Sequence, residues 1–301
     1  MSVFQPFRGI RPRPDLAAGL SCPPYDVVNT REARDLALGQ PLSFLRVIKP
    51  EIDLPDGADP YASEVYQRGR ENFVALQTGG HFLQDDDPSF YLYRLTMDGR
   101  SQTGVVGQAS VEEYYRDLIK KHELTRPEKE DDRVNHMRAL DAQPEPVFLA
   151  YRAHAEIDAL VESLSREDPE YLFEADDGVK HEWWTIADAT INLRLQELFS
   201  EVPCFYVADG HHRTAAAARV GRERQAANPG RNDSETYDYL LAAVFPDDQL
   251  RILDYNRVVR DLNGLSEDEF LSRLSDECEV GDPTAEPPVP EGVRSFGLYL
   301  D

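Results

Sequence analysis

The segment Phe205–Arg219 constrains the fold of this chain more than any other stretch, and it reads Phe-Tyr-Val-Ala-Asp-Gly-His-His-Arg-Thr-Ala-Ala-Ala-Ala-Arg. An apolar, β-prone run of Val202, Phe205, Tyr206 and Val207 stops at Asp209-Gly210, where glycine supplies the backbone freedom that a tight turn needs. Two histidines and an arginine follow, and then an alanine-rich run that favours a helix. The pattern predicts a strand, a tight turn and a helix.

Such a turn favours an anionic ligand. The free N–H groups and the positive dipole end of a helix N-terminus attract phosphate oxygens, and the side chains of His211, His212 and Arg213 add further donors. The carboxylate of Asp209 lies among these cationic groups, which suits a Mg²⁺ ion or a proton transfer. The alternative is an ordinary glycine turn whose adjacent histidines are surface residues.

A second polar segment lies between residues 120 and 133. Three of the five lysines of this acid-rich chain fall within ten residues there. One interpretation is a clamp for a polyphosphate, with Glu123 as a nearby base. The other is a solvated helix end with mixed charges, which is common. The segment contains Lys120, Lys121, His122, Glu123, Arg126, Lys129 and Arg133.

A third segment, Cys22-Pro-Pro-Tyr-Asp-Val-Val28, lies in the proline-rich first thirty residues. Its two prolines favour extended backbone and so fix the positions of Tyr25 and Asp26. Asp26 either bonds its own backbone as a turn residue or presents a carboxylate at a site.

Together the three segments resemble the ParB/sulfiredoxin-like superfamily and, within it, a large family catalogued as domain of unknown function 1015. That family is related to ADP-dependent free serine kinases. The resemblance implies an α+β fold: a ParB/sulfiredoxin-like mixed sheet core with helices and an insertion that contains a β-hairpin. Relatives often have histidine where Asn256 stands here, which weakens any catalytic role for that part of the chain.

The chain lacks the residues that several other reactions need. Sulfiredoxin chemistry needs a nucleophilic cysteine in the turn, where this chain has His211, and Cys204 lies further back in the apolar run. The chain contains neither a G-x-G-x-x-G nor a G-x-x-x-x-G-K-[ST] motif, and His-Glu-x-x-His is absent as well. Its three cysteines are unclustered and indicate neither a disulfide framework nor a zinc site.

The remaining hypothesis is a nucleotide-dependent phosphotransferase, a small-molecule kinase that uses ADP or ATP with Mg²⁺ on a small hydroxyl-bearing metabolite. The alternatives are a ParB-like nucleotide-binding switch and a non-catalytic nucleotide sensor; ADP, ATP and CTP are not distinguished. The catalytic candidates are Asp209, which is also the tentative Mg²⁺ ligand, His212, and Glu123 or Asp26 as the base. The expected phosphate-binding residues are Gly210, His211, Arg213, Thr214, His122, Arg126, Lys129 and Arg133.

Composition limits the partners. The net charge is −24, from 56 acidic and 32 basic residues, so the surface repels nucleic acid at ordinary salt. Acid excess with few lysines is typical of proteins from salt-loving organisms. No apolar run approaches the roughly 20 residues that span a bilayer, and the first residues form no apolar signal segment. We expect a cytoplasmic protein without a membrane partner.

The expected organisation is one domain over residues 1–282, with an inserted region at about 80–200. Residues 283–301 are expected to form a proline-rich linker and the start of a truncated C-terminal part. Residues Asp98-Gly99 predict a hairpin between two strands. The expected helices are Thr30–Leu38, Tyr61–Gln77, Val111–His122 with a Ser110/Glu113 capping box, Asp132–Ala142 after a start near Pro127, Ile157–Leu164, Ile186–Phe199, residues 211–224 and one that opens at Ser266 with a capping box. The expected strands are Ser43–Ile48, Ser89–Thr96, Ser101–Ser110, Val147–Tyr151, Tyr237–Phe245 and Leu250–Val259.

Overall fold

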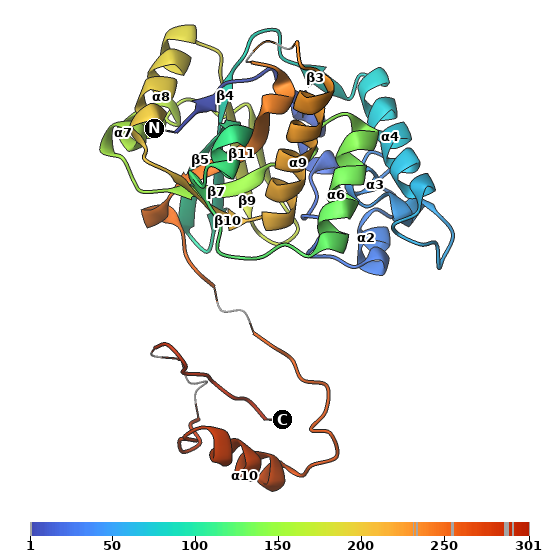
Figure 1. The fold of residues 1–301 in the computed structure, drawn as a ribbon, viewed down its shortest axis with the longest axis vertical. Coiled ribbons are helices and arrows are strands. Elements are labelled where there is room, and N and C mark those ends of the chain that lie inside the picture. The colour runs from blue at the N-terminus through green and yellow to red at the C-terminus, as the bar shows by residue number, and fades with distance from the viewer. Residues whose placement is uncertain are drawn as a thin grey trace. The chain divides into compact units, whose positions relative to one another are not determined.

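The computed structural model describes residues 2–230, 232, 234–253, 256–285, 289–290 and 292–300. The chain divides into two compact units, Met1–Leu250 and Arg251–Asp301. In the described part of the first unit, a nine-stranded mixed sheet has the order β6-β10-β7-β11-β5-β4-β9-β8, with β1 paired to β5 (Figure 1). The strands are β1 Phe4–Gln5, β4 Phe90–Met97, β5 Arg100–Ser110, β6 Ile119–Lys120, β7 Val147–Tyr151, β8 Tyr171–Glu174, β9 Lys180–Ile186, β10 Phe205–Asp209 and β11 Tyr239–Pro246.

The sheet is mixed because two of its pairings, β10 with β6 and β11 with β7, are parallel, whereas its other pairings are antiparallel. A separate two-stranded sheet pairs β2, Ile10–Pro12, with β3, Phe82–Gln84. Together with the helices, this arrangement confirms the predicted α+β class.

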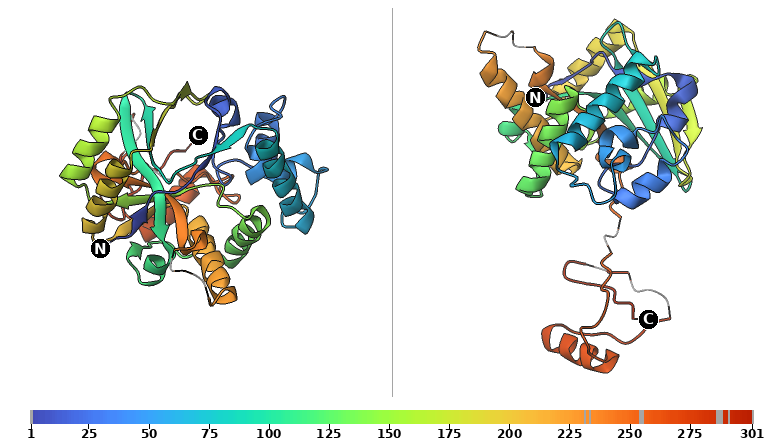
Figure 2. Two further views of the ribbon diagram at one scale, coloured as in Figure 1. Left: turned by 90° about the horizontal axis from the view of Figure 1, so that it is seen from above. Right: turned by 90° about the vertical axis from the view of Figure 1, so that its right-hand side faces the viewer.

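The helices of the first unit are α1 Ala17–Leu20, α2 Thr30–Leu36, α3 Leu45–Ile48, α4 Ser63–Thr78, α5 Val111–Tyr115, α6 Pro127–Leu140, α7 Ala155–Leu164, α8 Ala189–Glu201 and α9 His211–Ala227. Helices α9, α6 and α4 pack side by side in that order (Figures 1 and 2). The second unit contains α10, Glu267–Glu277, which begins with the predicted capping box of Ser266 and Glu269. No described helix is long and apolar enough to cross a membrane.

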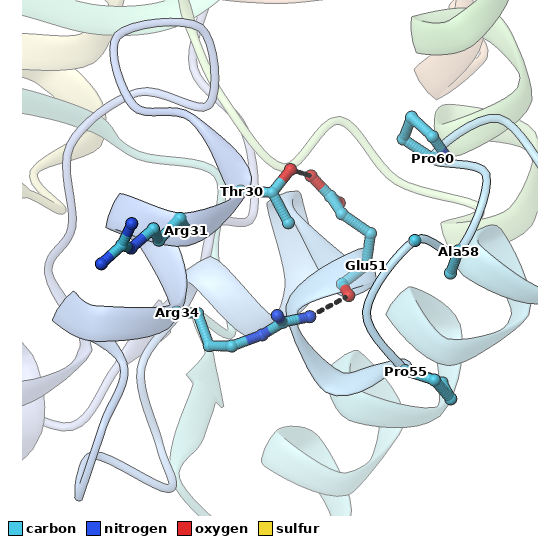
Figure 3. Close-up of a pocket in the computed structure, with 8 residues that line it drawn as sticks. Thr30, Arg31, Arg34, Glu51, Pro55, Ala58 and Pro60 are labelled. Carbon is cyan, nitrogen blue, oxygen red and sulfur yellow. Dashed lines mark hydrogen bonds between the residues drawn. The ribbon is translucent and has the colours of Figure 1, made fainter.

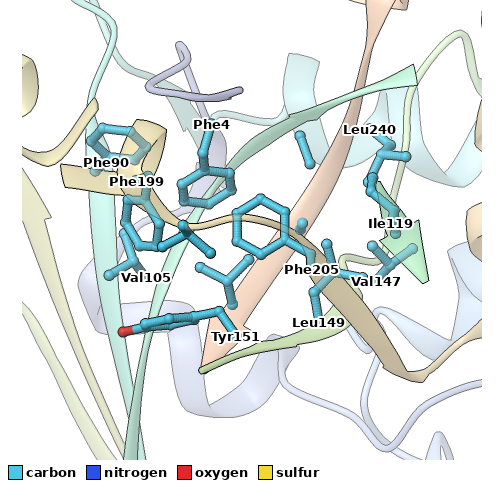
Figure 4. Packing of buried hydrophobic residues seen from close by; sticks show 14 of the residues in the cluster. Phe4, Phe90, Val105, Ile119, Val147, Leu149, Tyr151, Phe199, Phe205 and Leu240 are labelled. Carbon is cyan, nitrogen blue, oxygen red and sulfur yellow. The ribbon is translucent and has the colours of Figure 1, made fainter. Parts of the chain in front are cut away.

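The main core lies between the sheet and helices α7, α8 and α9, and Phe4 packs in it beside other aromatic rings (Figure 4). The ring centroid of Phe4 lies 4.8 Å from that of Phe199, 5.3 Å from that of Phe90 and 5.8 Å from that of Phe205. Burial of each such ring stabilises the fold by about 2–3 kcal/mol. Because Phe205 belongs to β10, this packing fixes the strand that leads to the candidate turn.

Helix α6 connects the main core to the N-terminal helices. Its residues Val134 and Met137 belong to the main core, whereas Leu140 packs in a second cluster with Val47 and Phe73. On the same helix, the buried His136 donates from Nε2 to the carbonyl oxygen of Val47 at 2.8 Å. Both clusters therefore determine where α6 and its polar residues lie.

Protonation of His136 is expected to destabilise the fold in acid. Burial, with the nearby positive charge of Arg133, lowers the pKa of His136 from 6.5 to about 3. The unfolded chain therefore takes up this proton at a higher pH than the folded chain, and stability is lost as pH falls below about 6.5, by about 1.4 kcal/mol per pH unit. Urea unfolding at pH 7.5, 6.5, 5.5 and 4.5 measures this slope. His136→Gln should show a shallower slope than wild type, and equal slopes would contradict the assignment.

Several expected elements are correct. The hairpin turn at Asp98-Gly99 has φ values of 52° and 73° and joins β4 to β5. Helix α6 begins at Pro127, and β7 and β11 match predicted strands. Helix α2 is capped by the side chain of Asn29, which accepts the N–H groups of Arg31 and Glu32. Residues 80–200 contribute β4, β5, β6, β7, β8 and β9 to the sheet that also contains β10.

The predicted strand Ser43–Ile48 is wrong, because its apolar residues form α3. Leu45 and Ile48 pack in one cluster and Val47 in another, so the short helix is buried on more than one side. With four apolar residues among six, this short run has no period that separates strand from helix. The predicted strand Leu250–Val259 is also not formed in its described residues; Asp254 and Tyr255 lie outside them.

The predicted helix Val111–His122 ends early, at Tyr115. Asp117 has φ 56°, and the chain then forms β6, which pairs in parallel with β10. The predicted Ser110/Glu113 capping box is wrong as well. The carboxylate of Glu113 is buried and instead accepts the backbone N–H of Val3 at 2.9 and 3.0 Å. Helix α8 begins at Ala189, after Ile186, which belongs to β9.

Candidate functional site

The turn between β10 and α9 consists of Asp209, Gly210 and His211. Gly210 has φ 83° and ψ 38°, the left-handed conformation that glycine adopts at little cost. The fully buried Thr214 fixes the first turn of α9, because its N–H and its Oγ1 both bond the carbonyl oxygen of Gly210, at 2.8 and 2.9 Å. The predicted strand–turn–helix is therefore present.

Arg213 lies beneath this turn and is only 6% exposed. Its Nη2 donates to Oδ2 of Asp209 at 2.8 Å, and its Nη1 donates to the carbonyl oxygen of Pro146 at 2.9 Å. Its Nε is buried and has no hydrogen-bond partner among the described residues. A Cβ at Gly210 would lie 3.0 Å from this nitrogen, so the turn and the guanidinium require glycine at this position.

His211 is also 6% exposed. Its Nδ1 lies 3.6 Å from Oε2 of Glu123, and its ring meets the ring of His122 edge to face at 4.4 Å. Burial and the charge of His122 lower the pKa of His211, against the opposing charge of Glu123. Its buried Nε2 has no partner in the described part of the chain. The imidazole is thus held neutral and keeps one free ring nitrogen.

His212 links the turn to the segment of the 120s. Its Nε2 accepts the backbone N–H of Arg126 at 3.1 Å. Arg126 is the N-cap residue of α6, and His212 lies in the first turn of α9. The N-terminal ends of two helices therefore meet at this contact, and their positive dipole ends reinforce each other.

The third sequence segment reaches the same region through Arg133 and Tyr25. The guanidinium carbon of Arg133 lies 3.8 Å above the ring of Tyr25, and burial raises the pKa of that phenol to about 12. Arg133 donates from Nε and Nη2 to Asp132 at 3.1 and 2.7 Å, and both residues are buried. Arg133 therefore holds the N-terminal segment against α6.

Glu145 joins the two buried arginines. Its Oε2 lies 3.8 Å from Nη1 of Arg133, its Oε1 accepts the N–H of Tyr25 at 3.4 Å, and its side chain is 11% exposed. Burial raises the pKa of Glu145, while the charges of Arg213 and Arg133 oppose this shift. A cavity of about 10 Å³, close to the room for one water molecule, is lined by Arg133, His136, Met137, Pro144, Glu145 and Arg213.

Sequence reasoning missed Glu145. The available signal is its place between Pro144 and Pro146, which restrict the backbone directly before a buried strand.

The remaining site candidates lie nearer the surface. Asp26 and Glu123 are exposed, and the charge of Asp26 contributes to the raised pKa of Glu145. Lys129 donates to the hydroxyl of Tyr61 at 3.2 Å and so points toward the start of α4. Lys120 and Lys121 bond Asp117 and the carbonyl oxygen of Tyr114. Among the described residues, no group of three or more His, Cys, Asp or Glu side chains is placed to hold a metal ion.

These observations define an α+β protein whose candidate site lies where a glycine turn meets the ends of two helices. The chain belongs to the DUF1015 family, described as a protein of unknown function, and the family model matches residues 4–301. This membership confirms the family resemblance of the three sequence segments. No curated protein and no solved structure matches the chain.

Proposed function

We propose that this protein is a nucleotide-dependent phosphotransferase of the ParB/sulfiredoxin-like superfamily, related to ADP-dependent free serine kinases. Its donor would be ADP or ATP with Mg²⁺, and its acceptor a small hydroxyl-bearing metabolite. One observation carries the proposal: the N-terminal ends of α6 and α9 meet at the contact between Arg126 and His212, above the buried Arg213 and His211. Two helix N-termini beside a guanidinium suit a polyphosphate.

In this proposal the backbone N–H groups at the start of α9 bind the terminal phosphates, and His211 and His212 add donors from their rings. Arg213 stabilises the charge that develops on the transferred phosphoryl group. The acceptor oxygen bonds to phosphorus as the bond from phosphorus to the leaving nucleotide oxygen breaks. The hydroxyl proton goes to Glu123 or Asp26, both of which are exposed.

The side chain of Asp209 is 64% exposed while it bonds Arg213, so one carboxylate oxygen can also face a metal ion. Mg²⁺ is commonly held by one or two carboxylates together with the substrate phosphates, and Asp209 fits that requirement. The second candidate is a sensor that binds a nucleotide at the same turn without turnover.

His212→Ala tests the site, because it removes the ring that joins the two helix ends. We expect the affinity for ADP or ATP, measured by calorimetry with Mg²⁺ in concentrated KCl, to fall about tenfold, as for one lost hydrogen bond to a charged group. Phosphate transfer to a metabolite mixture, followed by mass spectrometry, should fall at least as much. Arg222→Ala is the control, because Arg222 lies on the same helix as His212. It removes an exposed ion pair with Glu112 and should leave the nucleotide affinity at the wild-type value.

The outcomes separate the candidates. Binding with transfer supports the phosphotransferase, and binding without transfer supports the sensor. A nucleotide site at this turn would be contradicted if neither wild type nor His212→Ala bound nucleotide, or if both bound it with equal affinity.

A further inference from the structure

A second pocket lies between α2 and the loop of residues 54–60, within the N-terminal helical part (Figure 3). Its volume is about 230 Å³, below the roughly 300–1,000 Å³ of sites for drug-sized ligands. It contains none of the residues of the candidate site described above. Its wall includes Thr30, Arg34, Glu51, Pro55, Ala58 and Pro60.

Arg34 holds the wall of this pocket in place. Its Nε donates to the carbonyl oxygen of Ile52 at 3.1 Å, and its Nη2 donates to that of Leu54 at 3.0 Å. Its Nη1 also pairs with the carboxylate of Asp56. One guanidinium therefore fixes Ile52 and two points of the loop, Leu54 and Asp56.

Glu51 supplies the main polar group of the pocket. Its side chain is 10% exposed, and Figure 3 places it between Thr30 and the loop that carries Ala58 and Pro60. Its Oε1 accepts the hydroxyl of Thr30 at 3.3 Å and lies 3.1 Å from Nζ of Lys49. No described residue donates a hydrogen bond to its Oε2, so this oxygen keeps its lone pairs for a ligand.

The charges around this acceptor are balanced. Lys49 neutralises Glu51, and Asp56 neutralises Arg34. An ammonium ligand would meet the charge of Lys49, and a carboxylate or phosphate would meet that of Glu51. No carboxylate of the described residues pairs with Arg31, but its side chain points away from the loop in Figure 3. Balanced charge beside free acceptor lone pairs favours a neutral ligand that donates hydrogen bonds.

We infer that this pocket binds a small neutral polyol. One hydroxyl donates to Oε2 of Glu51, and a neighbouring hydroxyl bonds Oγ1 of Thr30. The C–H faces of the polyol pack on the apolar side chains of Pro55, Ala58 and Pro60. Since no residue of the turn takes part, this site stands independently of nucleotide binding.

Ligand-detected NMR on the full chain tests the inference with three small probes: erythritol as a neutral polyol, ethanolamine as a cation and glycerate as an anion. Erythritol should bind best, and Thr30→Val should raise its dissociation constant about tenfold, the effect of one lost hydrogen bond. Thr78→Val is the matched control, because the exposed Thr78 hydroxyl bonds the carbonyl oxygen of Val74 in its own helix.

Glu51→Gln provides a second variant and should weaken erythritol binding to a similar degree, with circular dichroism to verify that each variant is folded. Three results would overturn the inference. These are no binding of any probe, tighter binding of ethanolamine or glycerate than of erythritol, or wild-type affinity in both folded variants.

Discussion

Replacing Arg133 with alanine is expected to lower the free energy of unfolding by about 3–5 kcal/mol, the cost of removing one partner from a buried ion pair. Arg133 is 7% exposed and bonds the buried Asp132 through two nitrogens. It also faces Glu145 and covers the ring of Tyr25. Without it, two carboxylates lose their nearest cation, and the N-terminal segment loses its contact with α6.

Arg138→Ala is the matched control, because Arg138 lies on the same helix but at the surface. Its pair with Glu223 at 2.6 Å has partners that are 47% and 38% exposed. Pairs of this kind contribute about 0–1 kcal/mol. Guanidinium chloride unfolding at pH 7 should therefore separate the two variants by several kcal/mol. Equal losses would show that Arg133 has no special structural role.

The Arg133→Ala deficit should also grow as pH rises. Burial already raises the pKa of Glu145, and the charge of Arg133 opposes this shift. Removing that charge raises the pKa further, so the folded variant holds its proton more tightly than the unfolded chain. A raised folded-state pKa of an acid means that stability is lost as pH increases from the unfolded value through the folded value. We expect a smaller difference from wild type at pH 5 than at pH 8.

The strand–turn–helix could be predicted because its signal is local. The apolar run, the glycine and the alanines determine β10, the turn and α9 within fifteen residues of sequence. The hairpin at Asp98-Gly99 was predictable for the same reason, since a two-residue turn with positive φ selects these residues.

The other parts depend on contacts between distant segments, which no short pattern contains. Residues 45–48 form a helix because two separate clusters bury its apolar side chains. Glu113 leaves its helix cap because the N–H of Val3, 110 residues away in sequence, meets its carboxylate. The association of the three polar segments was a hypothesis from their composition. The arrangement of the side chains in the site, with Glu145 beside Arg133 and Arg213, follows only from the packing of α6 against the sheet and α9.

Gly210→Ala is expected to remove most nucleotide binding while the chain remains folded. A residue with a Cβ at φ 83° costs about 1–2 kcal/mol in backbone strain. The new Cβ would also lie 3.0 Å from Nε and 3.2 Å from Cζ of Arg213. Because Arg213 is held by Asp209 and by the carbonyl oxygen of Pro146, it cannot yield without breaking one of these bonds.

If the proposed phosphate site is correct, displacement of this guanidinium should weaken ADP or ATP binding about 30-fold or more, because losing a partner of a buried charged contact costs at least about 2 kcal/mol. Gly80→Ala is the matched control. Gly80 has φ 71°, and a Cβ there would meet nothing within 4 Å, so it carries a similar backbone cost without the contact.

Calorimetric titration with nucleotide and chemical unfolding of both glycine variants separate strain from displacement. Both should lose the stability that the backbone strain costs, Gly210→Ala should lose more because of its contact with Arg213, and only Gly210→Ala should lose affinity. If Gly80→Ala loses nucleotide binding to the same extent, the effect comes from general destabilisation. If neither variant loses it, Arg213 does not contact the phosphates, and the anion site would have to lie outside the turn.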